Sequence, residues 1–241
     1  MVAPQLFADP WLSKQLGKAA FHLAGRTEEI TDYLEPLSAR LSQGVPFADA
    51  KITVDSPAAM ASLQSLGFVL IDTTLQFEMP RDGLAIRNAA DVAFATPDDA
   101  EGIKSIAEGA FVYDRFHRDP AIPDGTANAL KRAWVQNFFA GQRGDWMVTA
   151  RRDGAAAGFL QLLKSVEGKL VIDLIAVGAP YRGAGLARAM IAFAARECDG
   201  TGSIIVGTQV SNIPSVRLYE SLGFRLTSAQ YVFHRHGATT C

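Results

Sequence analysis

Hydrophobic and polar positions along residues 85–241 follow a pattern that predicts strands and helices in alternation. Runs rich in β-branched residues, such as residues 203–208, are typical of buried strands, whereas residues 127–139 place Leu130, Trp134 and Phe138 at helical spacing. The expected elements are, in chain order, a strand (91–95), two helices (97–110 and 127–139), three strands (146–151, 157–164 and 169–177), a helix (186–197), a strand (203–208), a helix after Asn212 and a strand (225–234). Asp-Gly and Glu-Gly turns between the three consecutive strands predict that these strands are antiparallel.

The first block of the chain, up to about Pro80, contains a short repeat of the second block. Ser65-Leu-Gly-Phe68 recurs as Ser221-Leu-Gly-Phe224, and each copy follows a strand and a helix and precedes another strand. We interpret the first block as a degenerate half unit that extends the sheet. The alternative is chance, because Leu-Gly-Phe is a common helix ending. A turn at residues 80–83 separates the blocks and predicts two domains, 1–83 and 84–241.

Six residues between a predicted strand and a predicted helix, Arg182-Gly-Ala-Gly-Leu-Ala187, indicate an anion site. The start of a helix leaves backbone N–H groups unpaired, and these donors, with the positive end of the helix dipole, suit a pyrophosphate. Gly183 and Gly185 can adopt a positive φ, and Arg182 adds a permanent positive charge. A P-loop would need Gly-Lys-Ser/Thr here, and a dinucleotide fingerprint would need Gly or Ala at Arg188. An ordinary strand-to-helix turn is the remaining alternative.

The pattern Arg/Gln-x-x-Gly-x-Gly/Ala fits Arg182, Gly185 and Ala187 and resembles the coenzyme A pyrophosphate loop of the GNAT acetyltransferases. Downstream, residues 212–224 read Asn-x-x-Ser-x-x-x-Tyr-x-x-x-Gly-Phe, which looks like the second half of the acetyl-CoA site of that family. The resemblance implies an α/β (α+β) chain with the GNAT acyltransferase fold. In that fold a mixed, mostly antiparallel central sheet would follow a smaller N-terminal α/β half-domain. It also implies acetyl-CoA as the co-substrate.

The same resemblance implies which residues contact the co-substrate. They are Ile175, Ala176 or Val177, through a backbone N–H at a bulge in the strand before the loop; the loop residues Arg182, Gly183, Ala184, Gly185, Leu186 and Ala187; and Asn212 with Ser215. Asn212 also has the character of a helix N-cap. It therefore hydrogen-bonds the pantetheine arm, caps the helix, or does both.

Over most of its length the chain resembles one subfamily, the acetyltransferases of nucleotide-linked amino sugars such as dTDP-fucosamine. The resemblance rests on residues 50–52 and 63–68, the Arg115-Phe116 region, the glycine loop, and residues 208–219. It implies acetyl transfer to a primary amine of such a sugar nucleotide, and a short half-domain before the GNAT core that walls the substrate cleft. The alternatives are a GNAT enzyme for another small amine (an amino acid, a polyamine or an antibiotic) and a non-catalytic acyl-CoA-binding regulator.

Two residues are candidates for proton transfer. The resemblance places Tyr219 where a GNAT fold directs a tyrosine hydroxyl at the leaving thiolate, and a tyrosine pKa of about 10 keeps that hydroxyl protonated. The alternative for Tyr219 is a tyrosine of the core. Asp72, four residues after Phe68, stands where relatives carry a glutamate that acts as a base, directly or through water. The alternative for Asp72 is an exposed acid on a strand.

Arg115, His117 and Arg118 cluster in an irregular segment after the first helix of the second block. Because arginine grips phosphate in a bidentate manner, these residues are candidates for binding the diphosphate of a sugar nucleotide. A solvated surface loop is the alternative. His234 and His236, near the end of the last strand, are most simply surface residues.

Composition excludes several other functions. A net charge of −2 and a pI of about 6.1 give no basic surplus for nucleic acid. We also find no apolar run long enough to span a bilayer and no signal-peptide pattern, so neither nucleic acid nor membrane is an expected partner.

The only cysteines, Cys198 and Cys241, argue against a structural disulfide and predict a cytoplasmic protein. No His or Cys pair has metal-ligand spacing, so no metal is expected. A homodimer is plausible because such dimers are common, but no sequence feature establishes one.

Overall fold

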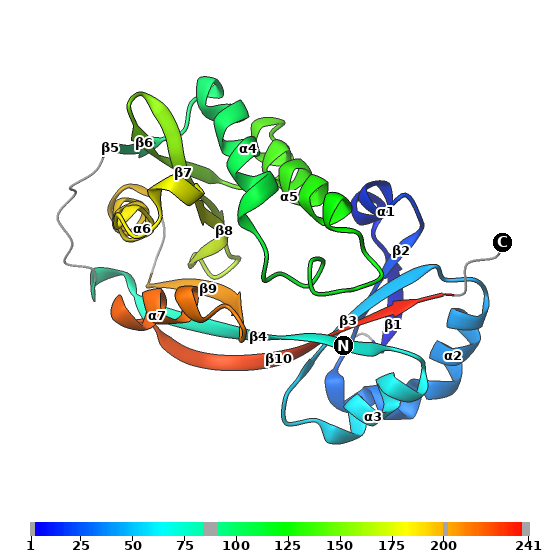
Figure 1. Cartoon of the computed structure of the whole chain (residues 1–241). Coiled ribbons are helices and arrows are strands. Elements are labelled where there is room, and N and C mark those ends of the chain that lie inside the picture. Colours follow the sequence, from blue (N-terminus) through cyan, green and yellow to red (C-terminus); the bar gives the residue numbers. More distant parts are fainter. Residues whose placement is uncertain (1–2, 84–90, 200–201, 238–241) are drawn as a thin grey trace. The chain divides into compact units, whose positions relative to one another are not determined.

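The computed structural model describes residues 3–83, 91–199 and 202–237 (Figure 1). The elements are β1 (Gln5–Ala8), α1 (Pro10–Leu16), β2 (Ala20–Ala24), a 3-10 helix (Thr27–Tyr33), α2 (Leu34–Ser42), β3 (Phe47–Thr53), α3 (Pro57–Ser65), β4 (Val69–Pro80), β5 (Asp91–Phe94), α4 (Ala100–Ala110), α5 (Asp124–Phe139), β6 (Trp146–Arg152), β7 (Ala155–Lys164), β8 (Leu170–Val177), α6 (Leu186–Glu197), β9 (Ser203–Gln209), α7 (Ile213–Ser221) and β10 (Arg225–His236). Every element predicted for residues 91–236 is present, and α5 begins three residues earlier than expected.

The chain divides into two compact units. Unit 1 contains Met1–Leu75, Asp114–Thr126 and Ser228–Cys241, and unit 2 contains Gln76–Tyr113 and Ala127–Thr227. The long strands β4 and β10 therefore each contribute residues to both units. The predicted boundary at residue 83 divides the chain into two continuous domains. The compact units are instead discontinuous: unit 1 consists of three segments and unit 2 of two.

The sheet of unit 1 has one apolar and one polar face. Its strands lie in the order β1-β2-β3-β10-β4, with β2 parallel to β3 and β10 antiparallel to β3. Alternate residues of the central strands point to opposite faces. Ala48, Ala50, Ile52 and Phe233 pack with buried leucines of α2 and α3 into the core of this unit. The opposite face carries charged and imidazole side chains, and residues 114–126 contact it.

The sheet of unit 2 is covered on both faces. Its strands lie in the order β4-β9-β8-β7-β6-β5, and β5 to β8 are antiparallel. The antiparallel pairing of β6, β7 and β8 was predicted. On one face, Ile103 of α4 and Val135 of α5 pack into a core with Phe159 of β7 and Leu174 of β8. On the other face lies α6 (Figure 1), whose side chains approach β7 so closely that a Cβ at Gly158 would lie 3.2 Å from Met190.

The repeat seen in the sequence has the same local structure in both copies. Helices α3 and α7 end identically: the N–H groups of Phe68 and Phe224 donate to carbonyls five residues earlier, at Leu63 and Tyr219. The glycine before each phenylalanine has a positive φ, 82° at Gly67 and 93° at Gly223, as this helix ending requires. A strand precedes each helix and a twelve-residue strand, β4 or β10, follows it. The interpretation of the first block as a half unit stays a prediction.

Among the described helices, none is both long enough and apolar enough to cross a membrane.

Candidate active site

The predicted anion loop follows β8 in unit 2. Gly183 and Gly185 have φ values of 79° and 76°, a left-handed conformation that favours glycine, and Gly185 is the N-cap of α6. The loop is exposed up to Leu186, whose buried side chain anchors the start of the helix. Arg182 donates from Nε to the carbonyl oxygen of Val177 at 3.2 Å, which ties the loop to the end of β8. The N–H groups of the first helical turn are thus presented beside a cationic side chain.

Strands β8 and β9 part next to this loop. On β8 their parallel pairing covers only Leu170 to Ile172, and the last pair is Ile172 with Val206. Strand β8 itself continues to Val177. From residue 173 onward this edge of β8 has no strand partner in β9. Backbone groups of Ile175, Ala176 and Val177 that face β9 are therefore available to a ligand, except the carbonyl oxygen of Val177, which accepts from Arg182.

The register irregularity of β8 lies earlier than the resemblance implied. We expected a bulge at residues 175–177, but Ile175 to Val177 pair regularly with β7, and the extra residue is Asp173, opposite the Gln161–Leu162 step. The bulge turns Asp173 toward α5. There its carboxylate accepts hydrogen bonds from Arg143 at 2.7 and 2.8 Å, from Trp134 Nε1 at 3.0 Å and from Gln161 Nε2 at 3.1 Å. This network holds the point at which β8 leaves β9.

Tyr219 lies on α7 with its ring in the core of unit 2. Its ring centroid is 6.0 Å from that of Phe77 and 5.5 Å from that of Phe224, and only 2% of the residue is exposed. Burial raises the pKa of Tyr219, which keeps the hydroxyl protonated. Tyr219 is therefore a core residue, and its role as a proton donor stays a prediction.

Asn212 and Ser215 form the N-terminal cap of α7. Asn212 Oδ1 accepts a hydrogen bond from the backbone N–H of Ser215 at 3.3 Å, and its Nδ2 donates to Thr208 Oγ1 at 3.2 Å. The predicted capping role of Asn212 is confirmed. A contact to a pantetheine arm stays a prediction.

Asp72 lies in unit 1 and is buried, not exposed. Its Oδ1 accepts the N–H of Thr73 at 2.7 Å, whereas the buried Oδ2 has no hydrogen-bond partner among the described residues. Burial raises its pKa, and this outweighs the opposing effects of the Thr73 hydrogen bond and the positive charge of Arg118; the nearby Asp114 raises it further. A buried carboxyl with a raised pKa and an unused oxygen has the properties of a proton acceptor.

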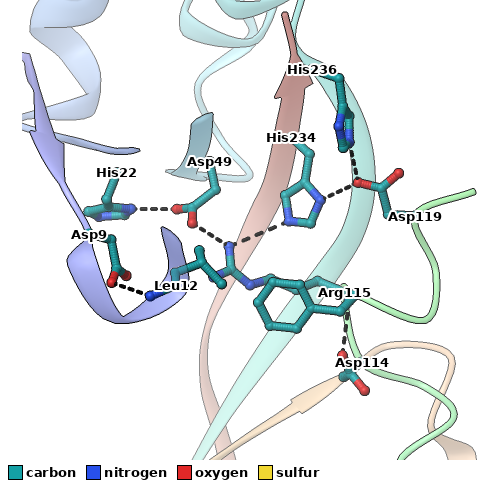
Figure 2. Close-up of polar contacts among 10 residues, drawn as sticks. Asp9, Leu12, His22, Asp49, Asp114, Arg115, Asp119, His234 and His236 are labelled. Carbon is teal, nitrogen blue, oxygen red and sulfur yellow. Dashed lines mark hydrogen bonds and ion pairs between the residues drawn. The ribbon is translucent and has the colours of Figure 1, made fainter. Parts of the chain in front are cut away.

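The three predicted substrate residues have different surroundings. Arg115 forms an ion pair with the buried Asp49, with 2.8 Å between Nη1 and Oδ2, and its guanidinium lies over the Phe116 ring (Figure 2). The side chain of His117 is 7% exposed, and its Nδ1 lies 2.5 Å from Asp114 Oδ2. Arg118 is exposed and makes no ion pair within the part of the chain that the structure describes. Its effect on the pKa of Asp72 places it near that carboxyl.

Sequence reasoning missed the buried polar cluster beneath these residues. His234 was expected at the surface, but it is fully buried, and its Nδ1 lies 2.6 Å from Asp119 Oδ2, which His236 Nε2 also approaches at 2.7 Å (Figure 2). His234 and His236 share a face because they are two residues apart on β10. The pattern His-x-His on a strand was the available signal, but its partner Asp119 is more than a hundred residues away.

These three side chains also have the geometry of a metal site. One ligand atom from each of Asp119, His234 and His236 lies within 4.8 Å of the others. Lys18 Nζ is 3.2 Å from His236 Nδ1 and can only donate, so the ring proton of His236 lies on Nε2 and points at Asp119. Arg115 Nη1 also can only donate, and it lies 3.5 Å from His234 Nε2. The ring proton of His234 therefore lies on Nδ1 and points at Asp119. A metal would need a lone pair on His234 Nδ1 and on His236 Nε2, but both nitrogens carry a proton in this arrangement. The arrangement therefore favours a hydrogen-bonded triad over a metal site.

Comparisons with known proteins relate one part of the chain to a family. Residues 110–224 match the model of the acetyltransferase (GNAT) family. This part of the chain is a GNAT acetyltransferase domain. The chain has a TM-score of 0.64 to a GCN5-related N-acetyltransferase from Kribbella flavida, at 15% identity and with 99% of this chain and 89% of that one covered. The predicted family and fold class are confirmed.

Two curated proteins resemble this chain. One is the spore coat polysaccharide biosynthesis protein SpsD of Bacillus subtilis, which is 30% identical over 140 residues, or 57% of this chain and 48% of SpsD. This chain thus matches about half the length of SpsD. The other is the dTDP-fucosamine acetyltransferase of Escherichia coli, 24% identical over 189 residues, which cover 77% of this chain and 80% of that enzyme.

Replacing Asp119 with Asn tests whether its charge stabilises unit 1. Burial opposes ionisation of Asp119, but hydrogen bonds from His234 and His236 outweigh it and hold the pKa below its usual range. We expect Asp119→Asn to lower the free energy of unfolding by about 2–4 kcal/mol at pH 7. Since the folded pKa is below the unfolded value of about 3.9, this stabilisation is complete above that value and is lost as the pH falls toward the folded pKa.

Urea unfolding followed by circular dichroism at pH 7, 5 and 3 measures this difference. The gap between wild type and Asp119→Asn should be constant from pH 7 to 5 and smaller at pH 3. Asp55→Asn, at an exposed position in the same unit, is the control and should change little. A gap that stays the same at pH 3 would contradict a role for the ionised carboxylate.

Proposed function

We propose that this GNAT protein transfers acetyl from acetyl-CoA to the primary amine of a nucleotide-linked amino sugar. The observation that carries the transferase part is the anion loop at the start of α6, beside the parted strands β8 and β9, within a GNAT domain. The sugar-nucleotide part is supported by the likeness to dTDP-fucosamine acetyltransferase over 80% of that enzyme and by the name of SpsD.

The chain offers two kinds of contact to acetyl-CoA, which supplies the thioester. The N–H groups at the start of α6 and the Arg182 guanidinium would hold its pyrophosphate, because these donors and the helix dipole favour an anion. The open edge of β8 would accept the pantetheine arm much as it would accept a strand. A backbone N–H among Ile175, Ala176 and Val177 would then donate to the carbonyl oxygen, where negative charge develops.

Asp72 is proposed as the proton acceptor for the sugar ammonium or for the attacking amine. A carboxylate with an ordinary pKa is a weak base at neutral pH, and burial moves the pKa of Asp72 toward the working range. The resemblance implies a glutamate at this place in relatives, and the shorter aspartate either needs the amine to come closer or acts through a water molecule. The unsatisfied Oδ2 is the atom that would take the proton.

Tyr219 is proposed as the general acid. As the amine nitrogen bonds to the carbonyl carbon and the carbon–sulfur bond breaks, the phenol proton passes to the sulfur, and solvent then returns a proton to the tyrosine. Its hydroxyl forms no hydrogen bond to any residue that the structure describes, so the donor is not committed elsewhere.

Turnover on a substrate panel tests the proposed function. Thiol release from acetyl-CoA is measured with nucleotide-linked 3-amino and 4-amino sugars, with the same amino sugars lacking the nucleotide, and with amino acids, polyamines and aminoglycosides. We expect release only with nucleotide-linked sugars. Release only with simple amines would replace the substrate class, and coenzyme binding without any release would favour a regulator that binds acyl-CoA.

Tyr219→Phe tests the general acid. The variant keeps the ring that packs on Phe77 and Phe224, so we expect the melting temperature and the acetyl-CoA affinity to stay close to wild type. Loss of the proton donor should lower kcat by about 100-fold or more. Tyr231→Phe, a partly buried tyrosine in the core of unit 1, is the matched control and should retain activity. Full turnover by Tyr219→Phe would show that another group protonates the thiolate.

A further inference from the structure

On the polar face of the unit 1 sheet, the cations Lys51 and Arg115 both lie on the side that carries the carboxylate of Asp49. Asp49 and Lys51 point to the same side of β3 because they are two residues apart, and Arg115 reaches this face from residues 114–126. On the neighbouring strand, His234 lies opposite Asp49, and Val232 lies opposite Lys51. The residues next to Lys51 across the sheet therefore supply no negative charge.

Asp49 orients Arg115 but leaves much of its guanidinium unused. The ion pair with Asp49 and the approach to His234 both involve Nη1, and Phe116 packs against the guanidinium plane at 4.5 Å. Neither Nε nor Nη2 hydrogen-bonds to any part of the chain that the structure describes. The guanidinium of Arg115 is thus held in place and still has unused N–H donors, which is the arrangement that suits an oxyanion.

Asp49 itself has little capacity left to neutralise a second cation. It is buried, and burial opposes its ionisation, yet Arg115 and a hydrogen bond from His22 Nδ1 at 2.5 Å hold its pKa well below the usual range. One of its oxygens is paired with His22 and the other with Arg115. The carboxylate is therefore already engaged on both sides.

Lys51 is the cation left without an anion. It forms no ion pair or hydrogen bond with the described residues, although its side chain reaches solvent. Burial lowers its pKa, the positive charge of Arg115 lowers it further, and Asp49 compensates only in part. The exposed ammonium of Lys51 and the guanidinium of Arg115 repel each other on this face, and an anion that contacts both would relieve that repulsion.

We propose that Lys51 and Arg115 together bind a phosphate group of the nucleotide diphosphate carried by the substrate. Arg115 supplies directed donors, and Lys51 supplies a point charge. Asp49 and His22 act as positioning residues that keep the guanidinium in place. This inference rests on the proposed function, since it names the residues that recognise the nucleotide.

Binding of nucleoside diphosphates tests this inference without requiring turnover. The full-length protein is first saturated with coenzyme A, so that its own pyrophosphate site is occupied, and is then titrated calorimetrically with dTDP, UDP or inorganic pyrophosphate. We expect Lys51→Met to weaken binding of dTDP by about tenfold or more, as for a lost charged hydrogen bond. Lys51→Arg should retain most of the affinity. Lys164→Met, at an exposed lysine at the end of β7, is the control and should match wild type.

Asp49→Asn separates positioning from folding. If Asp49 orients Arg115 for phosphate, this variant should weaken dTDP binding several-fold while leaving the affinity for coenzyme A unchanged. In turnover, Lys51→Met and Asp49→Asn should both raise KM for the nucleotide sugar and leave KM for acetyl-CoA unaltered. Equal loss of both affinities would show that Asp49 acts only through stability.

The outcomes for this inference and for the proposed function can be told apart. Turnover of nucleotide sugars with an unchanged KM in Lys51→Met would overturn the phosphate site and keep the function. Binding of dTDP that depends on Lys51, without turnover of any nucleotide sugar, would keep the site and overturn the function. Wild-type protein that binds neither dTDP, UDP nor pyrophosphate would overturn the site directly.

Discussion

The separation of β8 from β9 is the constraint on which the GNAT domain depends. Parallel strands in a buried sheet normally pair along their common length, but here the pairing ends at Ile172 and Val206. The bulge at Asp173, fixed by Arg143, Trp134 and Gln161, lies where β8 leaves its neighbour. Beyond the bulge, β8 presents an unpaired strand edge that leads into a helix N-terminus. Both features leave backbone N–H groups without partners, and both therefore suit an extended, anionic ligand.

The two units show how one local structure can carry different chemistry. Helices α3 and α7 have the same ending and precede strands of equal length, yet the position of Tyr219 on α7 corresponds to Leu63 on α3, a fully buried aliphatic residue. Unit 1 instead carries its ionisable groups on the sheet face opposite its core. Two buried carboxylates, Asp49 and Asp119, connect that face to residues 114–126 through Arg115 and the histidines of β10. These contacts keep the segment bearing Arg118 and Asp114 in place near Asp72.

The sequence predicted features that depend on neighbouring residues. Strand and helix periodicity located the elements of residues 91–236, and the spacing of Arg182, Gly185 and Ala187 identified the loop, because each signal lies within a few positions. Among the elements before β3 that were not predicted, β1 and β2 are short, and α1 and the 3-10 helix have only seven residues each. The environments of Asp72, Arg115 and His234 could not be predicted either, because their partners come from distant segments. A charged residue on a strand looks exposed until the segment that covers it is known.

Coenzyme A binding to a loop variant is the most direct test of the central claim that the loop after β8 holds acetyl-CoA. Gly185→Val places a branched side chain at a φ of 76° beside the N–H donors, whereas Gly17→Val imposes a similar strain at a φ of 65° at the end of α1 in unit 1. Calorimetric titration should show a loss of affinity of about tenfold or more for Gly185→Val and little change for Gly17→Val. Wild-type affinity in Gly185→Val would contradict the account, because the anion would then be bound elsewhere.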